Sequence, residues 1–154
     1  MSGTSLDAVD AALILTDGEQ VLEFGPTAER KYLPEERAVL QRATDAARAW
    51  NWTGPQPGTI FTEAREAVTH THLATWERLL EGWAGPMPRL AGVHGQTVLH
   101  RAPKGDQLGA TLQLIDGPAL QAALGVTLAY DFRTDDVAAG GQGASKIDAN
   151  VLSQ

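Results

Sequence analysis

The first third of the chain alternates short apolar runs with a helical pattern. Residues 9–15 and 20–24 are rich in apolar residues and have the length of strands, and Asp17-Gly18 between them is a strong turn signal. From Pro34 to Trp50, apolar residues recur every three or four positions, as they do along one face of a helix. These patterns predict a β-hairpin followed by a helix.

A second helical pattern follows a loop. Residues 51–58 contain two glycines and two prolines and predict a break, and an apolar stripe then runs through residues 60–83 until Gly85-Pro86. His72 lies on this stripe, so we expect a hydrogen-bonded core histidine and not a ligand. The four tryptophans lie on or beside the two helices, where we expect them to pack in the core and at its edge.

The second half contains three shorter apolar runs. Residues 90–93, 110–115 and 126–130 predict strands. A short helix is expected between the last two, with Asp116 as its N-cap and Gly125 at its end. Alternation of strands and helices predicts one α/β domain in which helices flank a mixed sheet.

Composition excludes several classes of protein. The chain has 154 residues, enough for a domain that buries about two thirds of its unfolded surface. With 12 basic and 19 acidic residues the net charge is −7, which argues against binding to nucleic acid or to anionic membranes. Cysteine is absent, so disulfides and thiolate sites are excluded. Without an apolar span or a signal segment, a cytoplasmic protein is expected.

The opening turn is a candidate phosphate site. Gly3 allows close approach of the backbone, Thr4 and Ser5 add hydroxyl donors, and Asp7 is suited to organising a metal ion or its waters. A polar N-terminal turn without a ligand is the alternative.

His94-Gly95-Gln96-Thr97 follows the strand at 90–93 and offers an imidazole, an amide and a hydroxyl. Such groups suit sugar hydroxyls, which need paired donors and acceptors. A polar junction that satisfies its own backbone is the alternative. Ligands of open α/β sheets bind beyond the carboxyl ends of strands, where this segment is expected to lie.

Asp131-Phe132-Arg133 follows the strand at 126–130, and we expect Asp131 and Arg133 on the same side of an extended chain. Arg133 would bind a substrate carboxylate or phosphate, and Asp131 would accept from hydroxyls. The alternative is an Asp–Arg pair that ties down a loop. The glycine-rich residues 140–143 match no nucleotide-binding spacing and predict only unusual backbone angles or close contact.

Together these segments resemble the anhydro-N-acetylmuramic acid kinase family. The resemblance rests on M-S-G-T-S-L-D-x-V-D at the start, V-H-G-Q-T, T-L-Q before a helix, and D-F-R-x-x-D-x-A-A-G-G-Q-G-A. Order and spacing fit the family up to Ala144. The resemblance implies an N-terminal domain (residues 1–144) of the actin-like fold shared by sugar kinases, Hsp70 and actin, followed by a divergent tail, residues 145–154.

The resemblance also implies a reaction. Family members use ATP and Mg²⁺ to open 1,6-anhydro-N-acetylmuramic acid with water while phosphorylating O6, which gives N-acetylmuramic acid 6-phosphate for cell-wall recycling. The residues implied in nucleotide binding are Gly3, Thr4, Ser5, Leu6, Asp7, Ala8, Val9 and Asp10, with Asp7 at the metal. The residues implied in sugar binding are His94, Gln96, Thr97, Asp131 and Arg133.

Family members are more than twice as long, and the second domain with the general-base aspartate is expected beyond Gln154. No catalytic base is therefore assigned within this chain. Ala8 stands where the family has glycine, and Asp116-Gly117-Pro118 transposes a Gly-Asp-Pro pattern. We expect a fragment that is inactive alone. The alternatives are a non-catalytic sugar- or nucleotide-binding domain, or half of a split kinase. The protein partners left open are a separate C-terminal half and a second copy of the chain in a homodimer.

Overall fold

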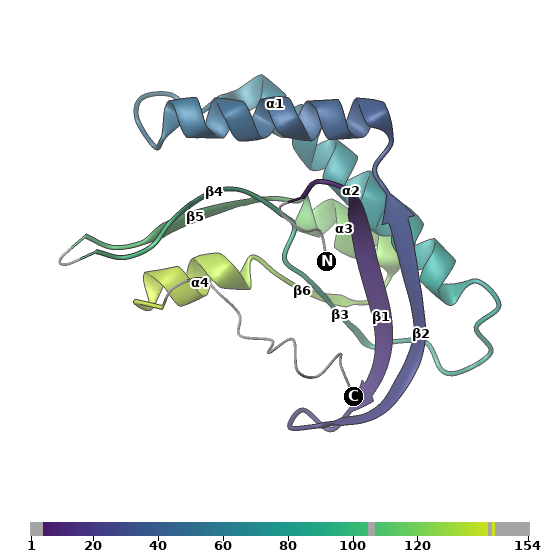
Figure 1. Cartoon of the computed structure of the whole chain (residues 1–154). Coiled ribbons are helices and arrows are strands. Elements are labelled where there is room, and N and C mark those ends of the chain that lie inside the picture. Colours follow the sequence, from purple (N-terminus) through teal and green to yellow (C-terminus); the bar gives the residue numbers. More distant parts are fainter. Residues whose placement is uncertain (1–4, 105–106, 142, 144–154) are drawn as a thin grey trace.

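The computed structural model describes residues 5–104, 107–141 and 143. A strand hairpin and two long helices are followed by shorter strands and two short helices (Figure 1). The elements are β1 (Ala8–Thr16), β2 (Val21–Lys31), α1 (Pro34–Trp50), α2 (Gly58–Leu80), β3 (Leu90–Val93), β4 (Gln96–Arg101), β5 (Ala110–Leu114), α3 (Gly117–Leu124), β6 (Thr127–Tyr130) and α4 (Phe132–Ala138).

The predicted hairpin is confirmed by β1 and β2, which pair antiparallel. Local hydrogen bonds close its turn: Asp17 Oδ1 accepts from the N–H groups of Glu19 and Gln20, both over 2.9 Å. Strand β2 continues to Lys31, well past the predicted end at residue 24. Gly25-Pro26 lies inside β2 because a strand at the edge of a sheet tolerates a missing backbone donor.

The start of α1 is fixed by Glu36. Its Oε2 accepts from the N–H of Leu33 over 2.8 Å, which satisfies an otherwise unpaired donor at the helix N-terminus. Glu36 also pairs with Arg30 at the end of β2, and Arg30 donates to Thr71 on α2 over 2.7 Å. Burial raises the pKa of Glu36, but the hydrogen bonds from Arg30 and Leu33 outweigh burial and leave the pKa below its usual value. The hairpin and both long helices are thereby joined.

One apolar cluster holds these elements together. Helix α1 lies across the top of the molecule in Figure 1 and packs on α2 and β4, while α2 also contacts β1, β2 and β5. His72 is buried and its Nδ1 contacts the carbonyl of Val68 at 2.8 Å, as predicted for a core histidine. The buried cluster comprises Leu6, Val9, Tyr32, Leu40, Ala43, Ala47, Phe61, Ala64, Val68, Val98 and Leu114.

The strands form three separate pairs in the described part of the chain. Pairs β1–β2 and β4–β5 are antiparallel, and β3–β6 is parallel. Parallel and antiparallel pairs therefore both occur with flanking helices, which confirms the mixed α/β class. The described strands lie in two-stranded sheets, however, and not in the one mixed sheet that was predicted.

Two elements correct the sequence-based expectation. Gln96 and Thr97 were expected in a polar segment just after the strand at 90–93, but they begin a strand of their own, β4. Asp131 and Arg133 were expected on an extended chain, but Asp131 has a left-handed φ of 58° and Arg133 lies on α4. Two apolar residues are too few to predict β4, which is defined by its pairing with β5.

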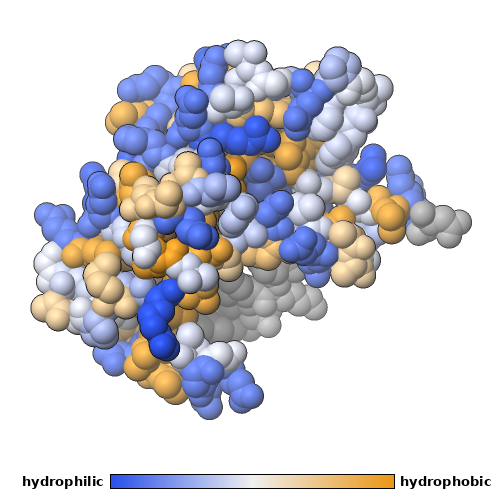
Figure 2. Space-filling model, turned by 180° about the vertical axis from the view of Figure 1, so that it is seen from behind, coloured by the Kyte–Doolittle hydropathy of each residue, from blue (hydrophilic) through white to orange (hydrophobic). Residues whose placement is uncertain are grey.

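The far half of the hairpin exposes apolar side chains. Ile14 is 46% exposed, and its cross-strand partner Phe24 is 60% exposed. Figure 2 shows hydrophobic side chains interspersed with polar ones over the surface seen from behind. The nearly continuous apolar run of β1 is typical of a strand that is covered on both of its faces. Helix α2 packs against this hairpin.

Among the described residues, no helix combines the length and the apolar character needed to cross a bilayer.

Candidate active site

The described part of the opening turn is built around Leu6. Its side chain is buried in the apolar cluster, and its φ of 54° is a left-handed conformation uncommon for a residue other than glycine. The neighbours Ser5 and Asp7 are exposed. The turn is fastened to the end of β2 by a hydrogen bond of 2.9 Å from Tyr32 N–H to the Asp7 carbonyl.

Asp7 is a preorganised carboxylate. Its Oδ1 accepts from the Ser5 hydroxyl over 2.5 Å and from the Ala8 N–H over 3.0 Å. The Ser5 hydroxyl is the main reason that the pKa of Asp7 lies below its usual value. The described hydrogen bonds use Oδ1, which leaves Oδ2 to face a cation or water.

This geometry fits a magnesium ion. Mg²⁺ keeps several of its waters and takes one or two carboxylates together with substrate phosphates. Asp7 supplies one such exposed, ionised carboxylate. Ala8 and Val9 have buried side chains, so a role for them in nucleotide binding would run through the backbone, whereas Asp10 is exposed. Gly3 and Thr4 lie outside the described residues.

The start of β4 presents two polar side chains. Gln96 is fully buried, and its Nε2 donates to the Thr97 carbonyl over 3.2 Å. Thr97 pairs in register with Gln113 on β5, whose Nε2 lies 3.3 Å from Thr97 Oγ1 and 2.6 Å from Thr111 Oγ1. The β4–β5 pairing thus creates a row of polar groups at the candidate site.

Arg133 joins this row from α4. Its Nη1 donates to Thr97 Oγ1 over 3.0 Å, and its Nε donates to the Gly143 carbonyl over 2.5 Å. The Gly143 N–H donates to Asp136 over 2.8 Å. Arg133 and Asp136 therefore hold the glycine-rich loop from two sides. Gly143 has a φ of 66°, and a Cβ there would lie 2.7 Å from Val137, so the predicted unusual angles and close contact are confirmed.

Asp131 begins α4 instead of pairing with Arg133. Its Oδ1 accepts from the Thr134 hydroxyl over 2.6 Å, and its carbonyl accepts from the Thr134 N–H over 3.0 Å. In the described part of the chain, no ion pair joins Asp131 to Arg133. Arg133 does tie down a loop, as the structural alternative supposed, but it does so through Gly143.

His94 lies between β3 and β4. Partial burial lowers its pKa, and the positive charge of Arg133 lowers it further, so the imidazole is neutral at pH 7. A neutral imidazole offers one donor and one acceptor. The turn after it requires glycine, because Gly95 has a φ of 68° and a Cβ there would lie 2.9 Å from the Leu114 carbonyl oxygen.

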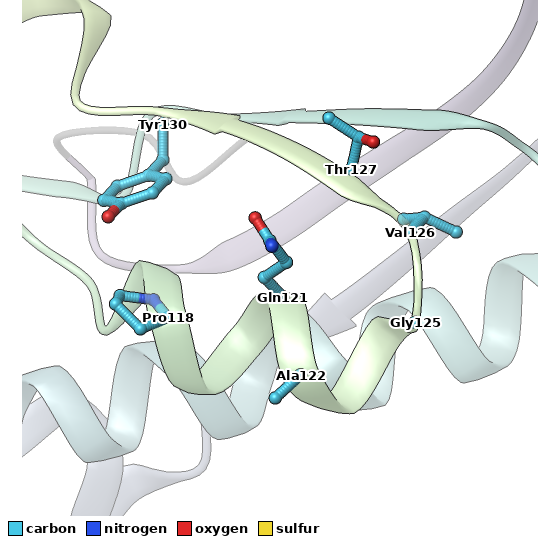
Figure 3. Close-up of a pocket in the computed structure, with 7 residues that line it drawn as sticks. All are labelled: Pro118, Gln121, Ala122, Gly125, Val126, Thr127 and Tyr130. Atoms are coloured by element: carbon cyan, nitrogen blue, oxygen red, sulfur yellow. The ribbon is translucent and has the colours of Figure 1, made fainter.

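A pocket of about 290 Å³ adjoins this network. It is lined by Arg65, Thr111, Leu112, Gln113, Ile115, Tyr130, Asp131 and Thr134. A larger hollow of about 600 Å³ lies between α3 and β6, where Tyr130, Gln121 and Pro118 face one another (Figure 3). Among the described residues that line the larger hollow, none is charged and none is a predicted site residue. The described lining of the smaller pocket includes two charged side chains, Arg65 and Asp131, and Asp131 is the predicted site residue among them.

The polar segments thus form two described groups. Thr97 and Arg133 are in contact, and His94 lies within the electrostatic influence of Arg133. Ser5 and Asp7 form the second group, which is linked to the first through the apolar cluster shared by Leu6 and Val98. Convergence of both groups on one hollow stays a prediction.

Comparison with known proteins decides the family. The family model described as anhydro-N-acetylmuramic acid kinase matches residues 1–151. The chain belongs to this family. Curated relatives named anhydro-N-acetylmuramic acid kinase are 50% identical in Rhizobium rhizogenes over 147 residues, 48% in Caulobacter vibrioides over 146, and 47% in Mesorhizobium japonicum over 147.

Each of these kinase relatives is matched over 94% of this chain and 39% of its own length. The chain therefore spans well under half the length of the anhydro-N-acetylmuramic acid kinases that it resembles.

Some residues that line the smaller pocket had a sequence signal and others had none. Thr111 and Gln113 belong to the T-L-Q segment, which was noted for its resemblance and not as a site. Tyr130 and Thr134 lie on either side of Asp131, which was predicted as a sugar-binding residue. Arg65 lies within the long helix α2, which has several charged residues, and the sequence does not distinguish the one that lines a pocket.

Proposed function

We propose that this chain supplies the phosphate- and sugar-binding part of an anhydro-N-acetylmuramic acid kinase with an actin-like fold. The reaction is ATP-dependent phosphorylation of 1,6-anhydro-N-acetylmuramic acid coupled to hydrolytic ring opening, which gives N-acetylmuramic acid 6-phosphate for cell-wall recycling. The observation that carries the proposal is the hydrogen bond between Thr97 and Arg133, because it joins two of the motifs on which the family resemblance rests.

On the nucleotide side, the turn from Gly3 to Asp10 cradles the phosphates of ATP. The left-handed Leu6 turns the backbone while its side chain anchors the turn in the core. Asp7 holds Mg²⁺, directly or through its waters. A metal ion bound there would neutralise charge on the phosphates, and phosphoryl transfer depends mainly on such positioning and electrostatic stabilisation.

On the sugar side, the neutral His94 and the hydroxyl of Thr97 meet sugar hydroxyls, and Asp131 accepts from another. Gln96 is buried and orients the start of β4. Arg133 already donates to Thr97 and Gly143, so it positions the loop and the threonine around the sugar. No residue of this chain is assigned as the general base.

Direct binding tests this proposal. Calorimetry should detect both Mg²⁺·ATP and 1,6-anhydro-N-acetylmuramic acid binding to the chain. Asp7→Asn should weaken the nucleotide and leave the sugar unchanged, whereas Thr97→Ala should weaken the sugar. A folded wild-type chain that binds neither ligand would contradict the proposal.

A further inference from the structure

The pocket beside the Thr97–Arg133 network is lined by residues from helix α2, from strands β5 and β6, and from the start of helix α4. Arg65 comes from α2, Thr111 and Gln113 come from β5, and Asp131 and Thr134 come from the start of α4. Leu112 and Ile115 add apolar surface. A volume of about 290 Å³ is near the lower end for small-molecule pockets, which matches a ligand of the size of one sugar ring.

Arg65 is an uncommitted cation in this pocket. It is half-buried, and in the described part of the chain no hydrogen bond or ion pair engages its guanidinium. Other arginines are engaged: Arg30 pairs with Glu36, and Arg78 donates to the Glu29 carbonyl. An arginine that lines a polar pocket without a partner is suited to a planar anion such as a carboxylate.

Gln113 supplies a second, independent observation. Its side chain is only 8% exposed, its Nε2 donates to two threonines, and its Oε1 is buried without a hydrogen-bond partner. Buried polar atoms are almost always paired, so an orphaned acceptor in a residue that lines a pocket indicates a missing donor. A sugar hydroxyl or amide N–H supplies such a donor.

The pocket therefore offers separate partners for the two kinds of group on an acidic amino sugar. The carboxylate of Asp131 and Oε1 of Gln113 can accept from hydroxyl or amide donors, and as acceptors they cannot bind a carboxylate, while Nε2 of Gln113 is engaged by Thr97 and Thr111. Arg65 is the cation that can. Arg133, which sequence alone favoured as the anion partner, is occupied by Thr97 and Gly143.

We propose that Arg65 binds the carboxylate of an acidic amino sugar and thereby selects muramic-type sugars over neutral ones. This inference rests on the proposed function, since it assigns a specificity residue to the same sugar site.

Two probes that differ in the acidic side chain test it. The 154-residue chain is titrated by calorimetry, and by ligand-observed NMR where binding is weak, with 1,6-anhydro-N-acetylmuramic acid and with 1,6-anhydro-N-acetylglucosamine. The wild type should prefer the acid about 10-fold or more, since hydrogen bonds to charged groups are the strong ones. Arg65→Gln should remove this preference and leave the neutral sugar unchanged, and Arg65→Lys should keep part of it. Arg48→Gln, an exposed arginine on α1, should behave as the wild type.

The outcomes separate this inference from the proposed function. Equal affinity of the wild type for both sugars, or an unchanged preference in Arg65→Gln, overturns the role of Arg65 while sugar binding stands. Equal weakening of both sugars in a folded Arg65→Gln also overturns it. A wild type that binds neither sugar overturns the sugar-binding function and the inference with it. Circular dichroism confirms that each variant is folded.

Discussion

Arg133 on α4 donates a hydrogen bond of 3.0 Å to Thr97 on β4, across 36 positions of sequence. The same guanidinium holds the Gly143 carbonyl, so one side chain joins a strand, a helix and a glycine-rich loop. This arrangement makes Arg133 a positioning residue for the candidate sugar site, and it leaves the pocket cation Arg65 available for a ligand.

The first prediction concerns the hydrogen bond between Arg133 and Thr97. Thr97→Ala removes the acceptor of both Arg133 and Gln113 and should destabilise the fold by about 1–3 kcal/mol, since hydrogen bonds to charged groups contribute more than neutral ones. Thr97→Ser keeps the hydroxyl and should retain most of the stability and of the sugar affinity. Urea unfolding and sugar titration measure both effects. Equal sugar affinity in Thr97→Ala and the wild type would remove Thr97 from the site.

The second prediction concerns the ion pair of Arg30 and Glu36. Glu36→Gln should cost about 1–3 kcal/mol, because it weakens a charge-assisted pair and a helix cap together. The matched control is Glu63→Gln in the exposed pair of Arg42 and Glu63, whose effect should stay below about 1 kcal/mol. Unfolding in urea at pH 7 compares the two variants.

The same pair predicts a dependence on pH. The pKa of folded Glu36 lies below its ordinary value of 4.5, so the unfolded chain takes up the proton first as pH falls. The stabilisation is therefore fully present above the unfolded pKa and is lost as pH falls through the folded pKa. The stability difference between the wild type and Glu36→Gln should shrink over this acidic range. A constant difference from neutral pH down through that range would contradict the account.

The third prediction compares two glycines with the same φ of 68°. Gly125 has open space around a Cβ, so Gly125→Ala should cost only the left-handed strain of about 1–2 kcal/mol. At Gly95 a Cβ would also lie 2.9 Å from the Leu114 carbonyl oxygen, so Gly95→Ala should cost about 1–3 kcal/mol more. Thermal unfolding of both variants measures the difference. Equal costs would show that the backbone approach at Gly95 is looser than described.

The fourth prediction concerns Asp7. Asp7→Asn should weaken binding of Mg²⁺·ATP by about 10-fold or more, because it removes the proposed metal carboxylate. Glu19→Gln in the hairpin turn removes a carboxylate elsewhere and should leave nucleotide affinity unchanged. Calorimetry at fixed magnesium concentration measures both. Equal affinities in the two variants would remove Asp7 from the nucleotide site.

Elements with local signals were predictable from the sequence. The Asp17-Gly18 turn defined the hairpin, and Asp116 is the predicted N-cap of α3, where it accepts from the Ala119 N–H over 3.0 Å. Both signals depend on residues close in sequence, so they hold whatever the tertiary context.

The elements that the sequence analysis did not predict depend on contacts between residues far apart in the chain. Strand β4 is defined by its pairing with β5. Helix α4 begins at Asp131, whose left-handed conformation no local sequence pattern predicts. The candidate site residues Thr97 and Arg133 could be named from motifs. Their mutual hydrogen bond, and the place of Arg65 in a pocket with Gln113, follow only from tertiary packing.

The most direct test of the kinase function is a chimera. This chain replaces the 146 matched residues of the Caulobacter vibrioides relative, and mass spectrometry follows the conversion of 1,6-anhydro-N-acetylmuramic acid with ATP and Mg²⁺. The chimera should form N-acetylmuramic acid 6-phosphate, and most of this product should be lost when the chimera carries Asp7→Asn. A folded chimera that binds nucleotide and sugar but forms no product, or equal product from the Asp7→Asn chimera, would contradict the proposed function.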